Sequence, residues 1–400
     1  MTGRISTGML YMQSLTSMQS RQASMAKLQQ QLASGLKLNT AKDDPVGAGM
    51  AVGMDRAVAE LERLGKNGDV VGHRLSVQEN VLAQAGDVMG RIQALTVQAS
   101  NGTLSNGDRS AIAADIRSLR DALFDIANTA DGMGRYLFGG TQDASPPFAR
   151  SGGGVAYSGD QTQRRVEIAP QMYAADALPG SEVFMRVRTG DGRVDASAAA
   201  ANTGTGQIGS FAVADAAAWD GGRYQVVFDA SAGYEVRDSA GGVVGAGSFT
   251  LGEAITVHGL RLSISGRPAD GDTFEIGPAG TRDIFATLDQ LVQTLTMQPT
   301  TDAGRAAQQN ALRNSVRDVA TAEAHFIDVR ASGGAQLAAL DQADELRGAL
   351  DLTLQTTLSG LRDLDYPEAI TRFNLEKVAL DAAQLSFVQM QRLSLFDLMR

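Results

Sequence analysis

The sequence predicts an α+β protein in which long terminal helices form a coiled-coil-like bundle and a mostly β domain is inserted mid-chain. Apolar residues recur at helical spacing from Ile5 to about Thr129, as in amphipathic helices. The same spacing returns at about Arg282 and continues toward the C-terminus. Between the two stretches, glycine-rich turns separate short runs that alternate like strands. The predicted order along the chain is therefore helix, β insertion, helix.

The first predicted helix has a seam rich in methionine and leucine. Its members are Ile5, Met9, Met12, Met18, Met25, Leu28 and Leu32. Methionine at helical spacing is usually adaptable packing rather than a metal site. Little else in the chain remains to cover this seam, and such seams usually find a partner on another molecule.

The segment 33–51, ASGLKLNTAKDDPVGAGMA, interrupts the helical pattern. Its Asp43–Asp44 pair could be a metal-ligand set, a catalytic dyad or part of a structural break between two helices. Asp44 followed by Pro45 has the form of an N-cap with proline at the first helical position. Gly35 lies where a C-terminal glycine would end the preceding helix. We therefore interpret the acid pair as part of the structural break between two helices.

Two further helical runs follow. The first places Val71, Leu75, Leu82, Ala85, Met89 and Ile92 on one seam, with Gln78 as a polar exception. Ser105–Asp108 reads as a turn and helix cap. The second run spaces Ile112, Ile116, Leu119, Leu123 and Ile126 by four and three in alternation, which is the cleanest coiled-coil-like seam of the chain.

The residues from about Thr141 to Thr281 predict a β-rich domain. The only tryptophan, Trp219, lies here. The runs 223–228 (RYQVVF) and 234–237 (YEVR) alternate like strands, and glycine-containing turns separate them. Two small subdomains, divided near a weakly structured stretch from Asp195 to Gly209, are one possible arrangement.

Helical spacing then returns in several runs, and Gly333–Gly334 is expected to interrupt it. The runs contain Ile284, Leu288, Leu291, Leu295, Leu312, Val316, Val319 and Phe326 before the glycines, and Leu337, Leu340, Leu350, Leu354, Leu361 and Leu364 after them. The last predicted helix places Ile370, Phe373, Leu380, Phe387 and Met390 on one face.

Composition argues against several classes of function. A net charge of −10 disfavours nucleic-acid binding, which needs clustered Lys and Arg. The sequence has no run of about 18 apolar residues, so no membrane span is predicted. The first 19 residues lack the apolar core of a cleaved secretory signal. Cysteine is absent, so disulfides and thiolate sites are excluded.

No motif indicates catalysis, a cofactor or a metal. His73, His258 and His325 are scattered and lack metal-ligand spacing. The glycine-rich run 151–154 has no lysine of a phosphate loop and reads as a linker. Asp270–Gly271–Asp272 lacks the EF-hand spacing, and hairpin turns use the same residues.

Several passages resemble bacterial flagellins and, more closely, the FlgL family of hook–filament junction proteins. The segment 32–51 (LASGLKLNTAKDDPVGAGMA) is similar to the N-terminal flagellin signature, and 134–140 (GRYLFGG) resembles a FlgL passage of Tyr-Leu-Phe-Ala-Gly type. Further similar passages are 329–337 (VRASGGAQL), 363–370 (DLDYPEAI), 382–387 (AAQLSF) and 393–396 (LSLF). The resemblance covers about the first 140 and the last 120 residues. Pro367 departs from it, and so does the size of the β insertion.

The resemblance implies an exported structural subunit of the bacterial flagellum that joins the hook-side hook-associated protein to filament flagellin by helix-mediated polymerisation. It implies self-assembly into a ring, an export chaperone, the type III export apparatus, and an extracellular location reached without a cleaved signal peptide. No nucleic acid, membrane or cofactor is expected.

Two sites are expected, an assembly interface from the uncovered seams of the terminal helices and a signature turn from the resemblance. The assembly interface would comprise Met9, Met12, Met18, Met25, Leu28, Leu32, Phe373, Leu380, Phe387 and Met390. The signature turn would comprise Gly35, Leu36, Asp43, Asp44 and Pro45, with Leu36 and Leu38 anchoring the turn. Asp43 and Asp44 would cap the next helix and attract donors from a neighbouring helix.

Three domains are expected on this basis. Residues 1–40 with 365–400 would be terminal helices that order on assembly, 41–140 with 282–364 a helical bundle, and 141–281 a β-rich outer domain. Two alternatives stay open at this stage: a flagellin-like filament subunit, and a surface adhesin that displays the β domain.

Overall fold

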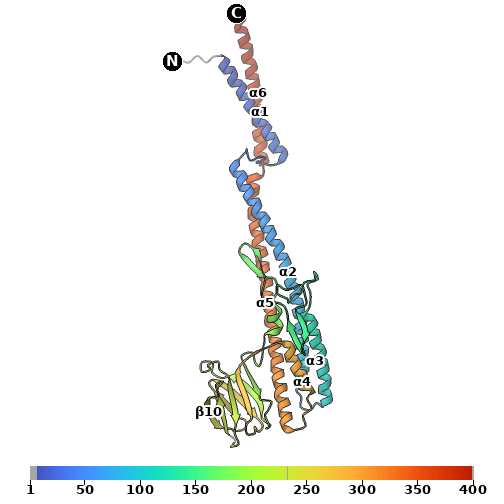
Figure 1. Cartoon of the computed structure of the whole chain (residues 1–400). Helices are drawn as coiled ribbons and strands as arrows, with labels where there is room; N and C mark the ends of the chain where they lie inside the picture. Colours follow the sequence, from blue (N-terminus) through green and yellow to red (C-terminus); the bar gives the residue numbers. More distant parts are fainter. Residues whose placement is uncertain (1–6, 232, 399–400) are drawn as a thin grey trace. The chain divides into compact units, whose positions relative to one another are not determined.

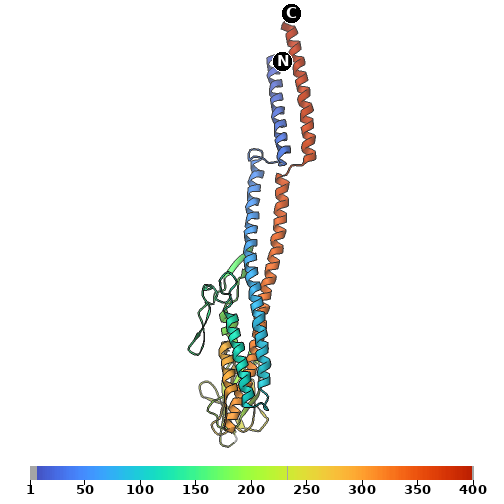
Figure 2. The ribbon, with the colours of Figure 1, turned by 90° about the vertical axis from the view of Figure 1, so that its right-hand side faces the viewer.

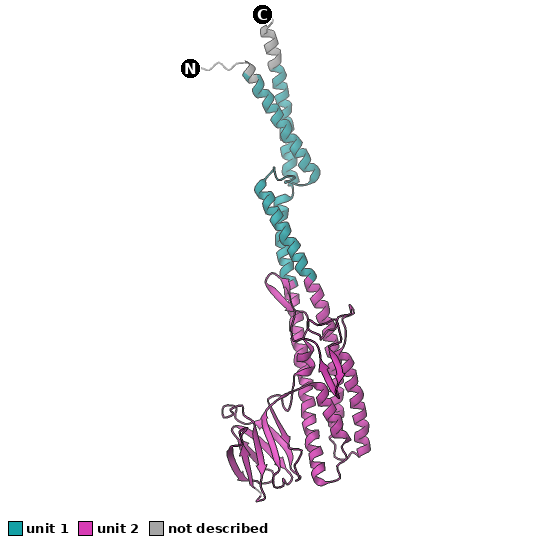
Figure 3. Ribbon diagram, viewed as in Figure 1, with its two compact units in different colours: residues 1–66, 344–400 teal, residues 67–343 magenta. Residues whose placement is uncertain are grey.

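The computed structural model of the 400-residue chain describes residues 7–231 and 233–398 (Figure 1). The side chains of residues 7, 8, 10 and 390–398 lie outside that description. The chain folds into two compact units, one of residues 1–66 with 344–400 and one of residues 67–343 (Figure 3). In the described residues the first unit is helical, and the second combines helices with the strands.

Long helices dominate the fold, as the sequence predicted. They are α1 (Thr7–Ser34), α2 (Pro45–Ala99), α3 (Asn106–Ala127), α4 (Ile284–Thr296), α5 (Asp302–Arg362) and α6 (Tyr366–Leu398). A short π-helical turn, η1 (Ser181–Met185), lies between the strands. The predicted α+β class, with a β domain between terminal helices, is confirmed.

The helical core of the second unit forms from the predicted seams of α2 and α3, packed with α4 and α5. Met89 and Ile92 of α2, Ile116 of α3 and Leu288 of α4 have no exposed surface and belong to one continuous cluster. The cap at Ser105 is also confirmed, because its hydroxyl and the Asp108 carboxylate satisfy each other's backbone amides.

Gln78, the polar exception on the α2 seam, is buried but fully bonded. Its side-chain oxygen accepts from the Leu178 amide at 3.1 Å, and its side-chain nitrogen donates to the Leu178 carbonyl at 3.1 Å. A buried amide with both partners costs little, so the exception is a specific contact between α2 and the segment that precedes η1.

The predicted interruption at Gly333–Gly334 is wrong, because α5 runs unbroken from Asp302 to Arg362. Glycine costs a helix interior about 1 kcal/mol relative to alanine, and neighbouring contacts offset that. Arg330 pairs with Glu79 of α2 at 2.8 Å, and Gln336 accepts from the Ala175 amide. Packing on both sides of the glycines therefore maintains the helix.

The strands form small hairpins and a sandwich. The strands are β1 (Phe148–Ser151), β2 (Gly154–Tyr157), β3 (Arg165–Ala169), β4 (Met172–Ala175), β5 (Val187–Arg188), β6 (Val194–Ala198), β7 (Gln207–Val213), β8 (Tyr224–Phe228), β9 (Gly233–Arg237), β10 (Val243–Ser248), β11 (Ala254–Val257), β12 (Leu260–Ser265), β13 (Thr273–Pro278) and β14 (Thr281–Arg282). The predicted strands at 223–228 and 234–237 are β8 and β9, which pair with each other.

The sandwich packs a five-stranded sheet, in the order β10-β9-β8-β13-β6, near a three-stranded sheet, in the order β11-β12-β7. Its core includes Val226, Phe274 and Leu260, all without exposed surface. The prediction of weak structure from Asp195 to Gly209 is wrong for most of β6 and the start of β7, where Ala196 and Ile208 contribute to this core. The hairpins β1–β2 and β3–β4 instead contribute Phe148 and Ile168 to clusters shared with the helices.

The sandwich is bonded directly to α5. The Asn310 side chain accepts from the Ile208 amide at 2.8 Å and donates to the Gly206 carbonyl at 2.9 Å. Arg313 donates to the Ile208 carbonyl at 2.9 Å. These bonds satisfy the Ile208 amide and carbonyl and the Gly206 carbonyl, so α5 fixes the start of β7.

A buried charge cluster holds the segment 134–143, which contains the Tyr-Leu-Phe motif, against α2. Arg74 lies 3.1 Å from Asp143 and 3.7 Å from Asp131, and it donates to the Tyr136 carbonyl at 3.1 Å. Leu137 and Phe138 are completely buried beside it. The motif is therefore structural, since it anchors the exit from α3 in the helical core.

Candidate assembly site

The two chain crossings of the first unit, from α1 to α2 and from α5 to α6, are hydrogen-bonded to each other. The Lys37 amide donates to the Arg362 carbonyl at 2.7 Å, and the Leu364 amide donates to the Gly35 carbonyl at 3.0 Å. Leu36 and Asp363 form an antiparallel bridge between these bonds. We call residues 35–37 and 362–364 the clasp (Figure 2).

Gly35 is required at the end of α1 for two reasons. Its φ is +70°, a left-handed conformation that costs other residues roughly 1–2 kcal/mol. A Cβ at this position would also lie 2.9 Å from the Tyr366 hydroxyl oxygen. The Gly35 amide still donates to the Gln31 carbonyl at 2.8 Å, so the helix closes normally before the chain turns.

Asp44 caps α2 as the sequence predicted. Its Oδ1 accepts from the amides of Val46 at 3.1 Å and Gly47 at 3.0 Å, and Pro45 is the first helical residue. Two of the free donors at the helix start are thereby satisfied.

Asp43 does not cap α2, contrary to the expectation. Its carboxylate accepts from the Thr40 amide at 3.0 Å and forms an ion pair with Lys27 of α1 at 2.9 Å. The Lys27 ammonium lowers the pKa of Asp43 to about 2 from the usual 3.8, with the Thr40 amide as the second cause. Because Asp43 lies before the cap, its side chain reaches back to α1. Lys27 of α1 is the donor from a neighbouring helix that was expected.

The terminal helices α1 and α6 pack side by side in both views (Figures 1 and 2). The rings of Tyr11 and Phe387 are 4.9 Å apart, and Arg21 pairs with Glu376 at 3.2 Å. Leu380 is only 5% exposed. A continuous contact therefore runs along both helices.

The predicted interface residues differ in exposure. Met18, Met25, Leu28, Leu32, Phe373 and Phe387 are half-buried, as is Leu36 of the signature turn, and Leu380 is buried. Met9 and Met12 are 67% and 65% exposed, and the side chain of Met390 lies outside the described residues. Their role in assembly stays a prediction.

Sequence reasoning missed a second apolar face of α6. Ile370, Val378, Leu385 and Val388 are exposed, and we call these four residues the α6 stripe. The sequence placed Ile370 on the same face as Leu380, and this placement is wrong, because Ile370 is 48% exposed and Leu380 is buried. The C-terminal segment contains apolar residues on more than one side, and periodicity alone selects a single face. Only the packing of α1 against Leu380 distinguishes the covered face from the stripe.

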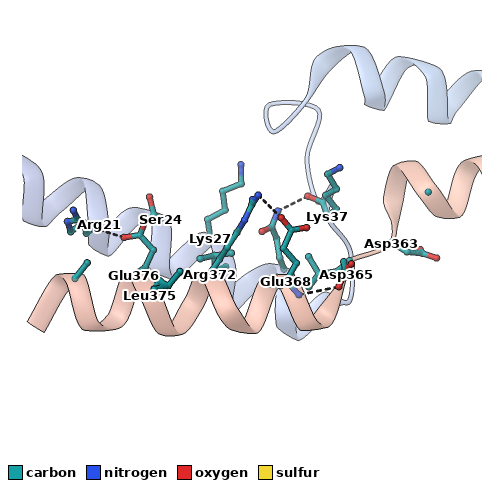
Figure 4. Close-up of a pocket in the computed structure, with 16 residues that line it drawn as sticks. Arg21, Ser24, Lys27, Lys37, Asp363, Asp365, Glu368, Arg372, Leu375 and Glu376 are labelled. Carbon is teal, nitrogen blue, oxygen red and sulfur yellow. Dashed lines mark hydrogen bonds and ion pairs between the residues drawn. The ribbon is translucent and has the colours of Figure 1, made fainter.

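A groove of about 870 Å³ lies beside the clasp, between α1 and the start of α6 (Figure 4). Its apolar lining includes Leu28, Leu364, Ala369, Leu375 and Ala379. Its charged lining comprises Arg21, Lys27, Lys37, Arg372, Asp363, Asp365, Glu368 and Glu376. A groove lined by both apolar and charged residues suits an amphipathic helix.

Most of the groove's charges already have partners in the same unit. Glu368 pairs with Arg372 at 2.7 Å, and Asp365 accepts from the Glu368 amide at 3.2 Å, capping α6. Among the described residues, Lys37 is the lining cation that forms no ion pair with an acidic side chain.

Within the described residues, no set of three His, Asp or Glu side chains is arranged to hold a metal ion. His73 is on α2, His258 stacks on Tyr224 of the sandwich, and His325 contacts the Glu182 carbonyl. No helix in the same part of the chain could cross a membrane. The exposed apolar faces and the groove are features of a protein-binding surface.

Comparison with known proteins gives consistent matches. Residues 5–143 match the family model described as the bacterial flagellin N-terminal helical region. The flagellar hook-associated protein 3 of Escherichia coli K12 is 28% identical over 395 residues, which is 99% of each chain.

Two solved structures match over most of the chain. Xanthomonas campestris FlgL is 51% identical, with a TM-score of 0.71 over 76% of this chain and 99% of that chain. The flagellar junction protein FlgL of Legionella pneumophila is 27% identical, with a TM-score of 0.70 over 78% of this chain and 100% of that chain.

Proposed function

The chain belongs to the FlgL family of flagellar hook-associated proteins, and we propose that it is a structural subunit of the hook–filament junction of a bacterial flagellum. The relatives matched along their whole length are structural flagellar proteins rather than enzymes. They imply partners among hook and flagellin components and an extracellular location on the flagellum.

The observation that carries the proposal is the pair of terminal helices, α1 and α6, with apolar side chains left uncovered. Met9, Met12 and the α6 stripe are each at least 46% exposed. Two paired helices leave much of their surface in water, and exposed apolar surface on this scale marks a contact with another molecule. Polymerisation through these helices would bury it.

The finer assignments are part of the same proposal. The subunit would contact the hook-side hook-associated protein at one end and flagellin at the other, and it would assemble with copies of itself into a ring. It would pass through the type III export apparatus with a chaperone and without a cleaved signal peptide. A charged groove and an apolar stripe are features that several such neighbours could use.

Folding coupled to assembly is also proposed. The division into terminal helices (1–40 with 365–400), helical bundle (41–140 with 282–364) and β-rich outer domain (141–281) assigns the coupled part to the termini. Because α1 and α6 bury only one face each, their order would rise when neighbouring subunits cover the other faces. Hydrogen exchange on the monomer tests this: strong protection across residues 370–390 without a chaperone would contradict it.

The alternatives have less support. The flagellin family model covers about a third of the chain, whereas the hook-associated relative matches 99% of it. An adhesin would display the sandwich on a stalk, but the direct bonds from Asn310 and Arg313 to β7 integrate the sandwich with α5.

Gene deletion tests the junction role directly. We expect intact hooks without filaments and flagellin released into the medium, and a plasmid copy of the gene should restore the filaments. If deletion left filaments attached and motility normal, the chain would not be the junction subunit. If the filaments were complete but shorter, the flagellin-like alternative would be favoured.

A further inference from the structure

The groove and the α6 stripe lie on different sides of the same helix. At about 100° per residue, the α6 residues that line the groove, such as Arg372 and Ala379, are centred about 160° from the stripe. The groove borders the contact with α1, because its lining residue Glu376 pairs with Arg21 of α1, whereas the stripe is turned away from the α1-facing residues Leu380 and Phe387. Each copy therefore presents one groove, which α6 shares with α1, and one apolar ridge on a different side of α6.

The two surfaces are also complementary in charge. Lys37 lines the groove and is exposed. Asp381 lies within the angular range of the stripe, between Val378 and Leu385, and is exposed. In the described part of the chain neither residue forms an ion pair. Within one chain they cannot meet easily, since Asp381 follows the first residue of α6 by fifteen positions, about 22 Å along the helix.

We propose that the groove of one copy receives the α6 stripe of a second copy, with Lys37 of the first opposite Asp381 of the second. This rests on the proposed function, because it specifies the contact by which copies of the chain assemble. The apolar side chains of the stripe would cover Leu375, which is 65% exposed, and the charged lining residues of the groove would contact the incoming helix.

The geometry of this contact makes it propagate. The two surfaces differ, so every bound copy leaves its own groove and its own stripe free for further copies. Contacts of this head-to-tail type generate rings or helical assemblies, whereas a self-matching surface stops at a dimer. Pairing Lys37 with Asp381 also displaces the two copies along the helix by about 22 Å, so the contact joins copies at different heights of the assembly.

Cysteine cross-linking in assembled flagella tests the contact, because the chain contains no cysteine. The double variant Lys37→Cys/Asp381→Cys should form a ladder of covalent multimers on oxidation, seen on non-reducing gels of isolated flagella. Each single variant should remain monomeric on the same gels. Monomers from the double variant in flagella that are normally assembled would overturn the proposal.

Charge exchange gives an independent test that does not depend on disulfide geometry. Lys37→Glu and Asp381→Lys each place like charges opposite one another and should weaken the contact about fivefold, measured as filament loss under shear. The double variant Lys37→Glu/Asp381→Lys restores opposite charges and should recover attachment. Glu345→Lys, an exposed change on α5, should have no effect.

The outcomes distinguish this inference from the junction role. If the single charge reversals lowered attachment and the double variant did not recover it, the pairing would be wrong while the junction role stood. If gene deletion left filaments attached, the junction role would fail whatever the charge variants did. If Lys37→Glu, Asp381→Lys, their double variant and Glu345→Lys all resisted shear equally, the pairing would be overturned and the junction role would stand.

Discussion

The end of α1 is the place where a single added methyl group has a predictable cost. Gly35→Ala introduces a Cβ at φ +70°, for which the backbone cost is roughly 1–2 kcal/mol. The same Cβ would lie 2.9 Å from the Tyr366 hydroxyl oxygen, while the next ring atom is 3.9 Å away. The hydroxyl must therefore move, which adds to the backbone cost.

Replacing Tyr366 with phenylalanine separates the two costs. In the Tyr366→Phe background the nearest remaining ring atom is at ordinary contact distance, so Gly35→Ala should cost only the backbone term. As a matched control, Gly49→Ala adds a methyl group inside α2 with no heavy atom within 4 Å. It should be neutral or stabilise the helix by up to about 1 kcal/mol.

Hydrogen exchange of the protein in isolated flagella, where the terminal helices are proposed to be ordered, reports the result at the clasp itself. The amides of Lys37 and Leu364 donate across the clasp, and a cost of 1–2 kcal/mol should speed their exchange about 5- to 30-fold. A Gly35→Ala protein whose two amides exchange at the parental rate would refute the argument from φ. An equal penalty with and without the Tyr366 hydroxyl would refute the argument from contact.

Three further outcomes are expected. Asp44→Ala should weaken the start of α2 by about 0.5–2 kcal/mol, seen as faster exchange of the Val46 and Gly47 amides, whereas Asp44→Asn keeps the acceptor and most of the protection. Ionised Asp43 should stabilise the turn at pH values above 3.8, and its contribution should be lost as the pH falls through its folded pKa of about 2. In a proton NMR titration, Lys27→Met should raise the pKa of Asp43. An unchanged pKa would show that the ion pair with Lys27 is not the main cause of the low value. Arg74→Met should destabilise the second unit by about 3 kcal/mol in guanidinium unfolding, because Asp131 loses this cation and Asp143 keeps only Arg135 at 3.8 Å and Arg164 at 3.6 Å. The exposed change Arg56→Met should alter stability by less than about 0.5 kcal/mol.

Local chemistry made several features of the break between α1 and α2 predictable from the sequence alone. An Asp-Pro pair satisfies donors within the next three residues, and a glycine at a helix end adopts a left-handed φ that other residues avoid. Both effects act over a few residues, so Asp44 and Gly35 could be assigned without a fold. Asp43 could not, because its partner Lys27 lies on the preceding helix.

Periodicity likewise located the seams of α2 and α3 but misjudged α5. The alternation of apolar residues is set by helical geometry, which is local. The continuity of α5 through Gly333 depends instead on Arg330 reaching Glu79 and on Gln336 reaching the Ala175 amide. Those partners are distant in sequence, so their contribution cannot be read from the glycines.

By itself, the sequence determined the helix–β–helix order, the breaks between helices and the likeness to a flagellar family. The tertiary structure alone decided which side of α6 is covered, how the two chain crossings join in the clasp, and where the groove lies. The physical reason is the range of the interactions. Caps, turns and periodicity act within a few residues, whereas the clasp joins Gly35 to Leu364 and the covered face of α6 depends on α1, more than 300 residues earlier in the chain.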